Sequence, residues 1–254
     1  MAIYGVSFKK SVGQQKLVEL IMNKQKKIIF GVGKAGTGKN TAALACALHL
    51  KENKEVEDII YTINPVQTGE NIGYLPGGIE EKVDPFMAPL DDALLGISRL
   101  STKFGEKHTK AERKSFVEQL KSQIIIEPVF NMRGRTFENT IMIVDECQNL
   151  DFKTLNTLMT RMGNFSKIVL LGSYNQIDNE KLRKKEKCDF QLTVEEFSKK
   201  KKRKIDISDE VELETDREDY VLDYVGFVEL TDSLRNPICV EIDDIFTKLK
   251  KMSK

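Results

Sequence analysis

The stretch Gly33-Lys34-Ala35-Gly36-Thr37-Gly38-Lys39-Asn40 decides the fold of this chain. The apolar residues 28–32 precede it, and the alanine-rich residues 41–50, which have a helix-forming composition, follow it. A glycine-rich turn between a strand and a helix is the context of a phosphate-binding loop, because backbone N–H groups and a helix N-terminus surround an anion there. The alternative from the residues alone is a glycine-rich turn that binds nothing.

The end of this loop departs from the usual pattern. Lys39 is placed to reach the outer phosphates, and the next residue is usually Ser or Thr, whose hydroxyl binds magnesium. Asn40 stands there instead, with Thr41 after it. An amide oxygen is an acceptable ligand for a hard cation, so we expect Asn40 to be a magnesium ligand. The expected nucleotide-binding residues are Gly33, Lys34, Ala35, Gly36, Thr37, Gly38, Lys39, Asn40 and Thr41.

Composition excludes several classes of protein. The chain has 254 residues, a formal net charge of +1 and four scattered cysteines without C-x-x-C spacing. These values predict one globular domain over residues 1–254, reduced thiols and only local basic surface. Because there is no long apolar stretch, we expect no signal peptide, no membrane span and a cytoplasmic location.

Further apolar runs predict the architecture. They cover residues 58–63, 124–126, 141–144, 168–171 and 225–230, and residues 152–162 have helical spacing after a capping Asp151. Continuous apolar runs are typical of strands buried on both faces. The sequence therefore predicts an α/β fold: a mostly parallel sheet with helices on both faces and ligand chemistry at the carboxyl ends of its strands.

Two acids follow one of these strands. Asp145 and Glu146 come directly after residues 141–144, where Asp145 would hold magnesium and Glu146 would orient or deprotonate the attacking water. Solvated acids at a strand end are common, but after a phosphate loop the pair completes one magnesium–nucleotide site. Gln176, beyond the next strand, is suited to sensing the γ-phosphate.

Several runs together resemble the PhoH-like ATPases, which are related to the superfamily 1 helicase core. The resemblance covers Gly13 to about Asp178 and resumes near Tyr224. It rests on the phosphate loop and on residues 69–77, 81–85, 132–136 and 145–149, in the order of the family's signatures.

The resemblance implies a RecA-like P-loop NTPase domain, often assembled as a hexameric ring, that uses ATP and Mg²⁺ and has RNA-related or helicase-like roles. By position, it implies that Gln15 contacts adenine and that Lys39, Asp145, Glu146 and Gln176 act in hydrolysis. Arg235 would stabilise charge on the γ-phosphate; a surface arginine at a helix start is the alternative.

Three positions around the expected pocket differ from the family pattern. Besides Asn40, Ser173 stands where Asp is usual, and Ile63 stands where Arg is usual. Two alternatives therefore remain open: an ATP-hydrolysing enzyme that acts on RNA or single-stranded DNA as a ring, and a nucleotide-binding regulatory or scaffold protein with weak or lost hydrolysis.

Two basic features remain. Arg133 and Arg135 flank a glycine. We expect them to contact nucleic-acid phosphates or a neighbouring subunit; the alternative is a solvent-exposed basic turn. Residues 180–223 are interpreted as a charged insertion, because six basic residues, 199–204, precede many acids. A surface excursion is the leading interpretation, and a contact with a phosphate backbone is the alternative.

Overall fold

The computed structural model describes residues 2–64, 87–104, 109–174, 176–177, 182, 185–199, 223–234, 241 and 245. Six strands of this part form one sheet, in the order β5-β4-β6-β7-β3-β8, and every neighbouring pair is parallel. Their bounds are β3 (Ile28–Gly33), β4 (Asp58–Ile63), β5 (Ile124–Pro128), β6 (Thr140–Val144), β7 (Lys167–Gly172) and β8 (Val225–Leu230).

The strand order confirms the predicted fold class. β3, which leads into the phosphate loop, is separated from β6, which leads into the acidic pair, by β7. This insertion of one strand between the two motif strands is the RecA-like arrangement that the resemblance implied. Each of the five runs predicted as strands, residues 58–63 through 225–230, is a strand of this sheet.

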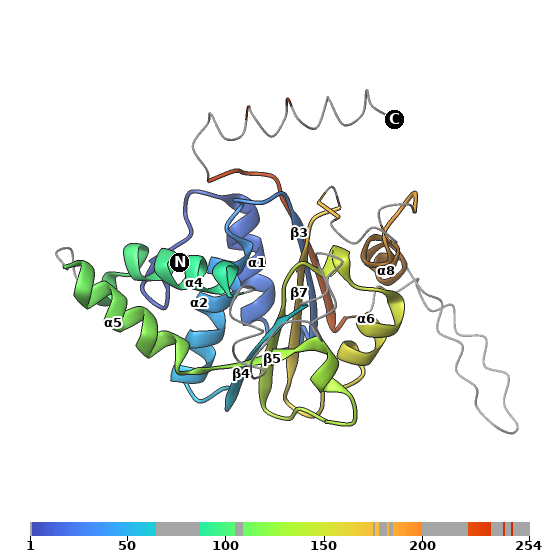
Figure 1. Cartoon of the computed structure of the whole chain (residues 1–254), viewed down its shortest axis with the longest axis horizontal. Helices are drawn as coiled ribbons and strands as arrows, with labels where there is room; N and C mark the ends of the chain where they lie inside the picture. Colours follow the sequence, from blue (N-terminus) through green and yellow to red (C-terminus); the bar gives the residue numbers. More distant parts are fainter. Residues whose placement is uncertain are drawn as a thin grey trace, which may run out of the picture.

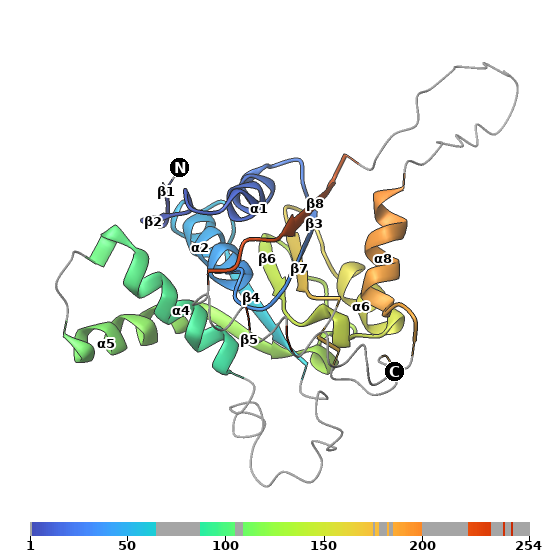
Figure 2. The same ribbon diagram turned by 90° about the horizontal axis from the view of Figure 1, so that it is seen from above.

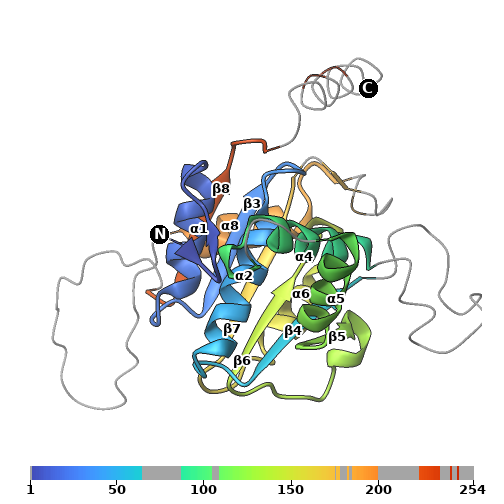
Figure 3. The ribbon, with the colours of Figure 1, turned by 90° about the vertical axis from the view of Figure 1, so that its left-hand side faces the viewer.

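Helices cover both faces of the sheet (Figure 1). One face carries α1 (Val12–Met22), α2 (Lys39–Glu52), α4 (Ala88–Leu100) and α5 (Lys110–Lys121). The other carries α6 (Phe152–Met159) and α8 (Asp189–Ser198). Figure 2 shows the sheet between these two helical layers, and Figure 3 shows α4 and α5 from their outer side.

Strand alternation builds two cores, one on each face. In β3, Ile29 packs with α1 and α2, whereas Phe30 and Val32 face α6 and α8. β6 repeats the pattern, with Ile143 in the first cluster and Val144 in the second. Because successive residues of a strand point to opposite faces, a run that is apolar at every position supplies both cores at once.

Polar caps fix the helix ends. Ser11 accepts a hydrogen bond from the Gln14 N–H at 3.2 Å at the start of α1, and Thr109 and Glu112 form a capping box on α5. The predicted cap of α6 is confirmed, since Asp151 Oδ1 accepts from the Thr154 N–H at 2.8 Å.

α6 is shorter than the helix predicted for residues 152–162. It ends at Met159, because the chain beyond it pairs with another segment: Arg161 O accepts from the Phe137 N–H and the Gly163 N–H donates to Phe137 O. Those backbone groups cannot also continue the helix.

Smaller elements were absent from the sequence prediction. A two-stranded antiparallel hairpin joins β1 (Ala2–Ile3) to β2 (Val6–Ser7), and 3₁₀ turns occupy η3 (Thr102–Phe104), η4 (Val129–Met132) and η5 (Cys147–Asn149). Such short segments carry too few residues for a periodic pattern.

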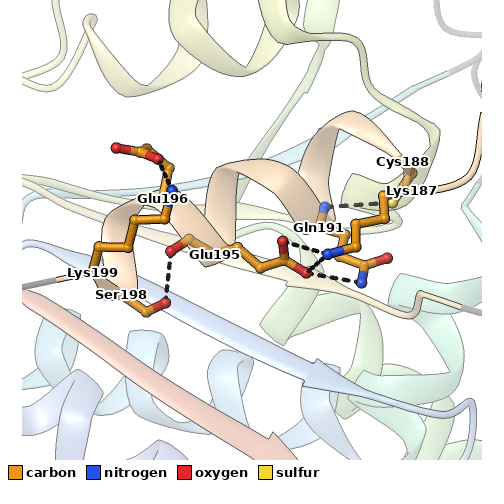
Figure 4. Close-up of polar contacts among 7 residues, drawn as sticks. All are labelled: Lys187, Cys188, Gln191, Glu195, Glu196, Ser198 and Lys199. Atoms are coloured by element: carbon orange, nitrogen blue, oxygen red, sulfur yellow. Dashed lines mark hydrogen bonds and ion pairs between the residues drawn. The ribbon is translucent and has the colours of Figure 1, made fainter.

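Part of the segment 180–223 packs into the core and is not a simple surface excursion. This part is α8. Phe190 of α8 is fully buried against Phe30 of β3, with ring centroids 6.1 Å apart. On the outer side of α8, Lys187 pairs with Glu195 at 2.8 Å (Figure 4). At the helix start the buried Cys188 Sγ accepts from the Gln191 N–H. α8 is therefore part of the second helical layer. Most of the basic run, residues 200–204, lies outside the described residues.

Among the described helices, none combines the length and the apolar character that a membrane crossing requires. Cys46, Cys147 and Cys188 are buried free thiols.

Candidate functional site

The predicted motifs meet at one edge of the sheet. In a parallel sheet all strands end on the same side, so the segments after β3, β6, β7 and β8 are brought together there. They supply the phosphate loop, Asp145, Ser173 and Asp232. The topology therefore brings the residues expected at the site to one edge of the sheet.

The phosphate loop has a backbone that only glycine adopts easily. Gly36 and Gly38 have φ values of 80° and 74°, and Gly38 is the N-cap of α2. Lys39 Nζ donates to the carbonyl oxygens of Gly33 at 2.6 Å and Lys34 at 2.9 Å. The lysine thus spans the loop, and the positive end of α2 lies beside it.

A glutamine of α1 holds this loop in place. Gln14 is 5% exposed, and its Nε2 donates to Thr37 O at 3.2 Å and Gly38 O at 3.4 Å. The neighbouring Gln15, expected at adenine, donates from Nε2 to Lys9 O at 3.2 Å. Gln14 is thus the glutamine of α1 that contacts the loop. Helical phase is the signal in the sequence, since Gln14 shares the inward face of α1 with Leu17, Val18 and Ile21.

The segment after β8 also contacts the loop. The Leu234 N–H donates to Gly36 O at 3.0 Å, and the hydroxyl of Ser11, the cap of α1, donates to Asp232 Oδ2 at 3.0 Å. Residues 231–234 therefore run beside the loop and the start of α1. Arg235 lies outside the described residues, as do the signatures at 69–77 and 81–85.

Asp145 is the centre of a buried hydrogen-bond cluster. It is 8% exposed, and its Oδ2 accepts from Asn40 Nδ2 at 2.5 Å and from Tyr61 Oη at 3.1 Å. Its Oδ1 accepts from the Glu146 N–H at 2.8 Å. Three donors therefore converge on this one carboxylate.

Tyr61 remains a donor in this cluster. Burial raises the pKa of its phenol well above the usual value, and the charge and hydrogen bond of Asp145 raise it further. The phenol is therefore protonated at neutral pH. Tyr61 was missed by the sequence reasoning, because nothing in an apolar strand marks one tyrosine as a partner of an acid on another strand.

The residues present fit a divalent cation. Asn40 Oδ1 is buried and has no hydrogen-bond partner among the described residues. A threonine hydroxyl would donate to Asp145 and offer its lone pair to the metal from one atom, whereas Asn40 divides the two tasks between Nδ2 and Oδ1. The described residues contain no group of three His, Cys, Asp or Glu side chains that could hold a metal ion. The buried Oδ1 of Asn40 and the Asp145 carboxylate lie side by side and offer oxygen atoms of the kind that magnesium prefers.

Glu146 is fixed by its backbone and by Gln148. Its φ of 52° is unusual for a residue with a side chain, and such a conformation costs about 1–3 kcal/mol, which often marks a functional site. Its Oε2 accepts from Gln148 Nε2. Gln148 is fully buried, donates also to Gln176 O at 2.8 Å, and accepts from the Ser173 N–H at 2.9 Å. The structure thus links Glu146 to the segment that contains Gln176.

The two arginines of residues 133–135 have different surroundings. Arg135 pairs with Glu127 at 2.7 Å and lies over the Phe137 ring, 5.0 Å from its centroid. Arg133 is exposed and forms no ion pair with any other described residue. Gly134, between them, has a φ of 76° and open space around it. Of the pair, Arg133 is the more available for a phosphate.

Comparisons with known proteins agree with these features. A family model described as "PhoH-like protein" matches residues 8–217. A PhoH-like protein of Bacillus subtilis is 38% identical over 171 residues, covering 66% of this chain and 49% of that protein. Protein PhoH of Escherichia coli is 35% identical over 153 residues, covering 60% and 40% respectively.

The matched segment is thus less than half the length of these relatives. A solved ATPase domain matches 67% of this chain and 65% of its own at 12% identity and a TM-score of 0.33, a likeness too weak to support an argument. The family model, in contrast, covers most of the chain, together with the phosphate loop, Asp145 and Glu146. The chain belongs to the PhoH-like protein family.

Proposed function

We propose that this chain binds ATP with Mg²⁺ and hydrolyses it. The observation that carries the proposal is the 2.5 Å hydrogen bond between Asn40 Nδ2 and Asp145 Oδ2. It joins the phosphate loop to the acidic pair, although their strands β3 and β6 are not neighbours. A donor of the loop thus lies directly on the carboxylate that would share Mg²⁺ with it.

The residues have separable roles in this proposal. Residues 33–41 bind the phosphates through backbone N–H groups, and Lys39 reaches the outer ones. Asn40 Oδ1 and Asp145 hold Mg²⁺, which when bound neutralises charge on the β- and γ-phosphates. Glu146 takes a proton from the attacking water, so that ATP and water give ADP and phosphate. Gln176 and Arg235 sense or stabilise the γ-phosphate.

Assembly and partners extend the proposal through the family resemblance. We infer a homo-oligomeric ring, hexameric by resemblance, that acts on RNA or single-stranded DNA in the cytoplasm. The exposed Arg133 supports a phosphate contact, because its guanidinium, which forms no ion pair with the described residues, costs little to move onto a nucleic-acid backbone.

A protein that binds nucleotide without turnover is the second candidate. It is favoured by Ser173 and Ile63, which remove charge near the site where the family carries it. Ser173 is 4% exposed, and its N–H is already used by Gln148.

A single-turnover ATPase assay with Mg²⁺ separates the two candidates. The proteins compared are wild type, Lys39→Ala, Glu146→Gln and Asn40→Thr, and binding of a fluorescent ATP analogue is measured for each. We expect wild type to hydrolyse ATP, Lys39→Ala to lose it, and Glu146→Gln to bind ATP while hydrolysing it about 10²–10⁴-fold more slowly.

Asn40→Thr is the decisive comparison. If Asn40 supplies both the hydrogen bond and the metal ligand, threonine gives at most a modest gain in rate. If wild type shows no activity above the Lys39→Ala background and Asn40→Thr restores it, the hydrolase proposal fails and the regulatory one stands.

A further inference from the structure

Tyr61 reaches the site from a strand that carries none of the sequence motifs. In the parallel pairing of β4 with β6, Tyr61 lies opposite Ile143. Asp145 is two residues beyond Ile143, and residues two apart in a strand direction share a face. The phenol and the carboxylate are therefore both on the face covered by α2, whose first turn contains Asn40.

The donors divide the two carboxylate oxygens unequally. Oδ2 accepts from both Asn40 and Tyr61. Among the described residues, Oδ1 accepts from the Glu146 N–H alone. A carboxylate has about four lone-pair sites, two on each oxygen. Both lone-pair sites of Oδ2 are thus occupied by described donors, whereas Oδ1 has one lone-pair site without a described donor.

We propose that Tyr61 is a positioning residue that, together with Asn40, fixes the orientation of the Asp145 carboxylate. In this orientation Oδ1 is the atom of Asp145 that faces the divalent cation of a bound nucleotide, either directly or through a water molecule on that cation. This inference rests on the proposed function and adds a residue to it. Tyr61 is 1% exposed, so it acts through Asp145 and does not contact the nucleotide.

The physical reason is the rotation of the carboxylate. With Asn40 as the single side-chain donor, the Asp145 carboxylate could turn about its last bond and present either oxygen. Tyr61 of β4, whose ring is packed in the core, adds a second donor to Oδ2 and removes that freedom. Partners of this kind, one step away from a metal, typically change metal affinity about 10–100-fold when removed.

Tyr61→Phe tests the proposal, because it removes the hydroxyl and keeps the ring that packs in the core. Binding of a fluorescent ATP analogue is measured in saturating EDTA and across a magnesium titration. We expect unchanged affinity without metal, and a magnesium concentration for half-maximal tightening that rises about tenfold or more. Circular dichroism and thermal melting check that the fold is retained.

Tyr4→Phe is the matched control. Tyr4 is 8% exposed and lies between β1 and β2, beside Lys103 rather than the acidic pair. It should lose a phenol without changing the magnesium titration. Asn40→Ala and the double variant with Tyr61→Phe complete a cycle, and we expect non-additive effects on the magnesium midpoint because both donors share Oδ2.

Three outcomes would overturn the inference. A magnesium titration of Tyr61→Phe equal to that of Tyr4→Phe removes the positioning role. An equal loss of affinity with and without metal assigns Tyr61 to packing alone. A wild type that binds no nucleotide in either condition overturns the proposed function and this inference with it, whereas the first two outcomes leave the proposed function standing.

Discussion

Asn40 uses its amide nitrogen for Asp145 and leaves its amide oxygen without a partner among the described residues. A threonine at position 40 would reach Asp145 and the cation from one hydroxyl oxygen. Asparagine keeps both interactions and changes only how far its polar atoms extend from the backbone. Gly38 is equally constrained, because its φ of 74° and the close approach of Gln14 leave no room for a side chain.

Gly38→Ala should therefore damage the loop. An added Cβ would lie 2.1 Å from Gln14 Nε2, which forces Gln14 off the carbonyls of the loop. The left-handed backbone alone costs alanine about 1–2 kcal/mol. We expect a lower free energy of unfolding in urea and a loss of nucleotide affinity of at least tenfold.

Gly134→Ala is the control for this change. Gly134 has a nearly equal φ of 76°, but nothing lies within 4 Å of an added Cβ. It should show the backbone cost in urea and keep full nucleotide affinity. Equal affinity for the two variants would contradict the role assigned to the contact between Gln14 and the loop.

At the scale of elements, α1 connects the loop to the segment after β8. Its first turn supplies Ser11 and Gln14, and its last turn is held by Lys167 of β7. Lys167 Nζ donates to Ile21 O at 2.7 Å and to Asn23 O at 2.5 Å. A cation at the carbonyl end of a helix is favourable, but this side chain is only 7% exposed.

Burial, followed by the charge of Lys27, lowers the pKa of Lys167 to about 8. The unfolded chain keeps this proton up to about pH 10.4. Between these values the unfolded state binds more protons, so the contribution of Lys167 to stability increases with pH.

Lys167→Met isolates this effect. The free energy of unfolding of wild type minus that of the variant should rise between pH 7 and pH 10, as measured by urea denaturation at each pH. Taking the difference cancels the titration of groups that both proteins share. A constant difference over this range would show that the ammonium is not destabilised by burial.

At the scale of the whole molecule, α8 belongs to the second helical layer, although the charge pattern of residues 180–223 predicts an insertion there. Phe190 of α8 packs against Phe30 of β3. Gly172 at the end of β7 leaves room for this ring, since an added Cβ would lie 2.6 Å from it. Asp189 accepts from the Phe152 N–H at 3.0 Å and so ties α8 to α6.

Phe190→Ala should destabilise the whole domain by about 3–5 kcal/mol, the usual cost of removing a buried phenylalanine. Leu192→Ala is the matched control, since Leu192 lies on the same helix and is 38% exposed; it should cost about 1 kcal/mol or less. Urea denaturation measures both. Equal small effects would mean that α8 is not part of the cooperative core.

Much of the fold could be predicted from residue patterns. The strands β3 to β8 are continuous apolar runs, and the phosphate loop and acidic pair each fall directly after one of them. The β1–β2 hairpin could not be predicted as readily, because each of its strands has only two residues and their contacts are with α2 and α4. The end of α6 at Met159 likewise depends on Phe137, a residue distant in the sequence.

The sequence by itself determined the chemistry that is available: a glycine-rich loop with Lys39, a carboxylate pair after a buried strand, and an asparagine in place of a hydroxyl. These are local facts, because strand, turn and helix follow each other within a few residues. Only the tertiary structure decided which side chains meet. Tyr61, Gln14 and Gln148 act across strand and helix boundaries, and their partners are set by sheet register and helical phase rather than by neighbours in the chain.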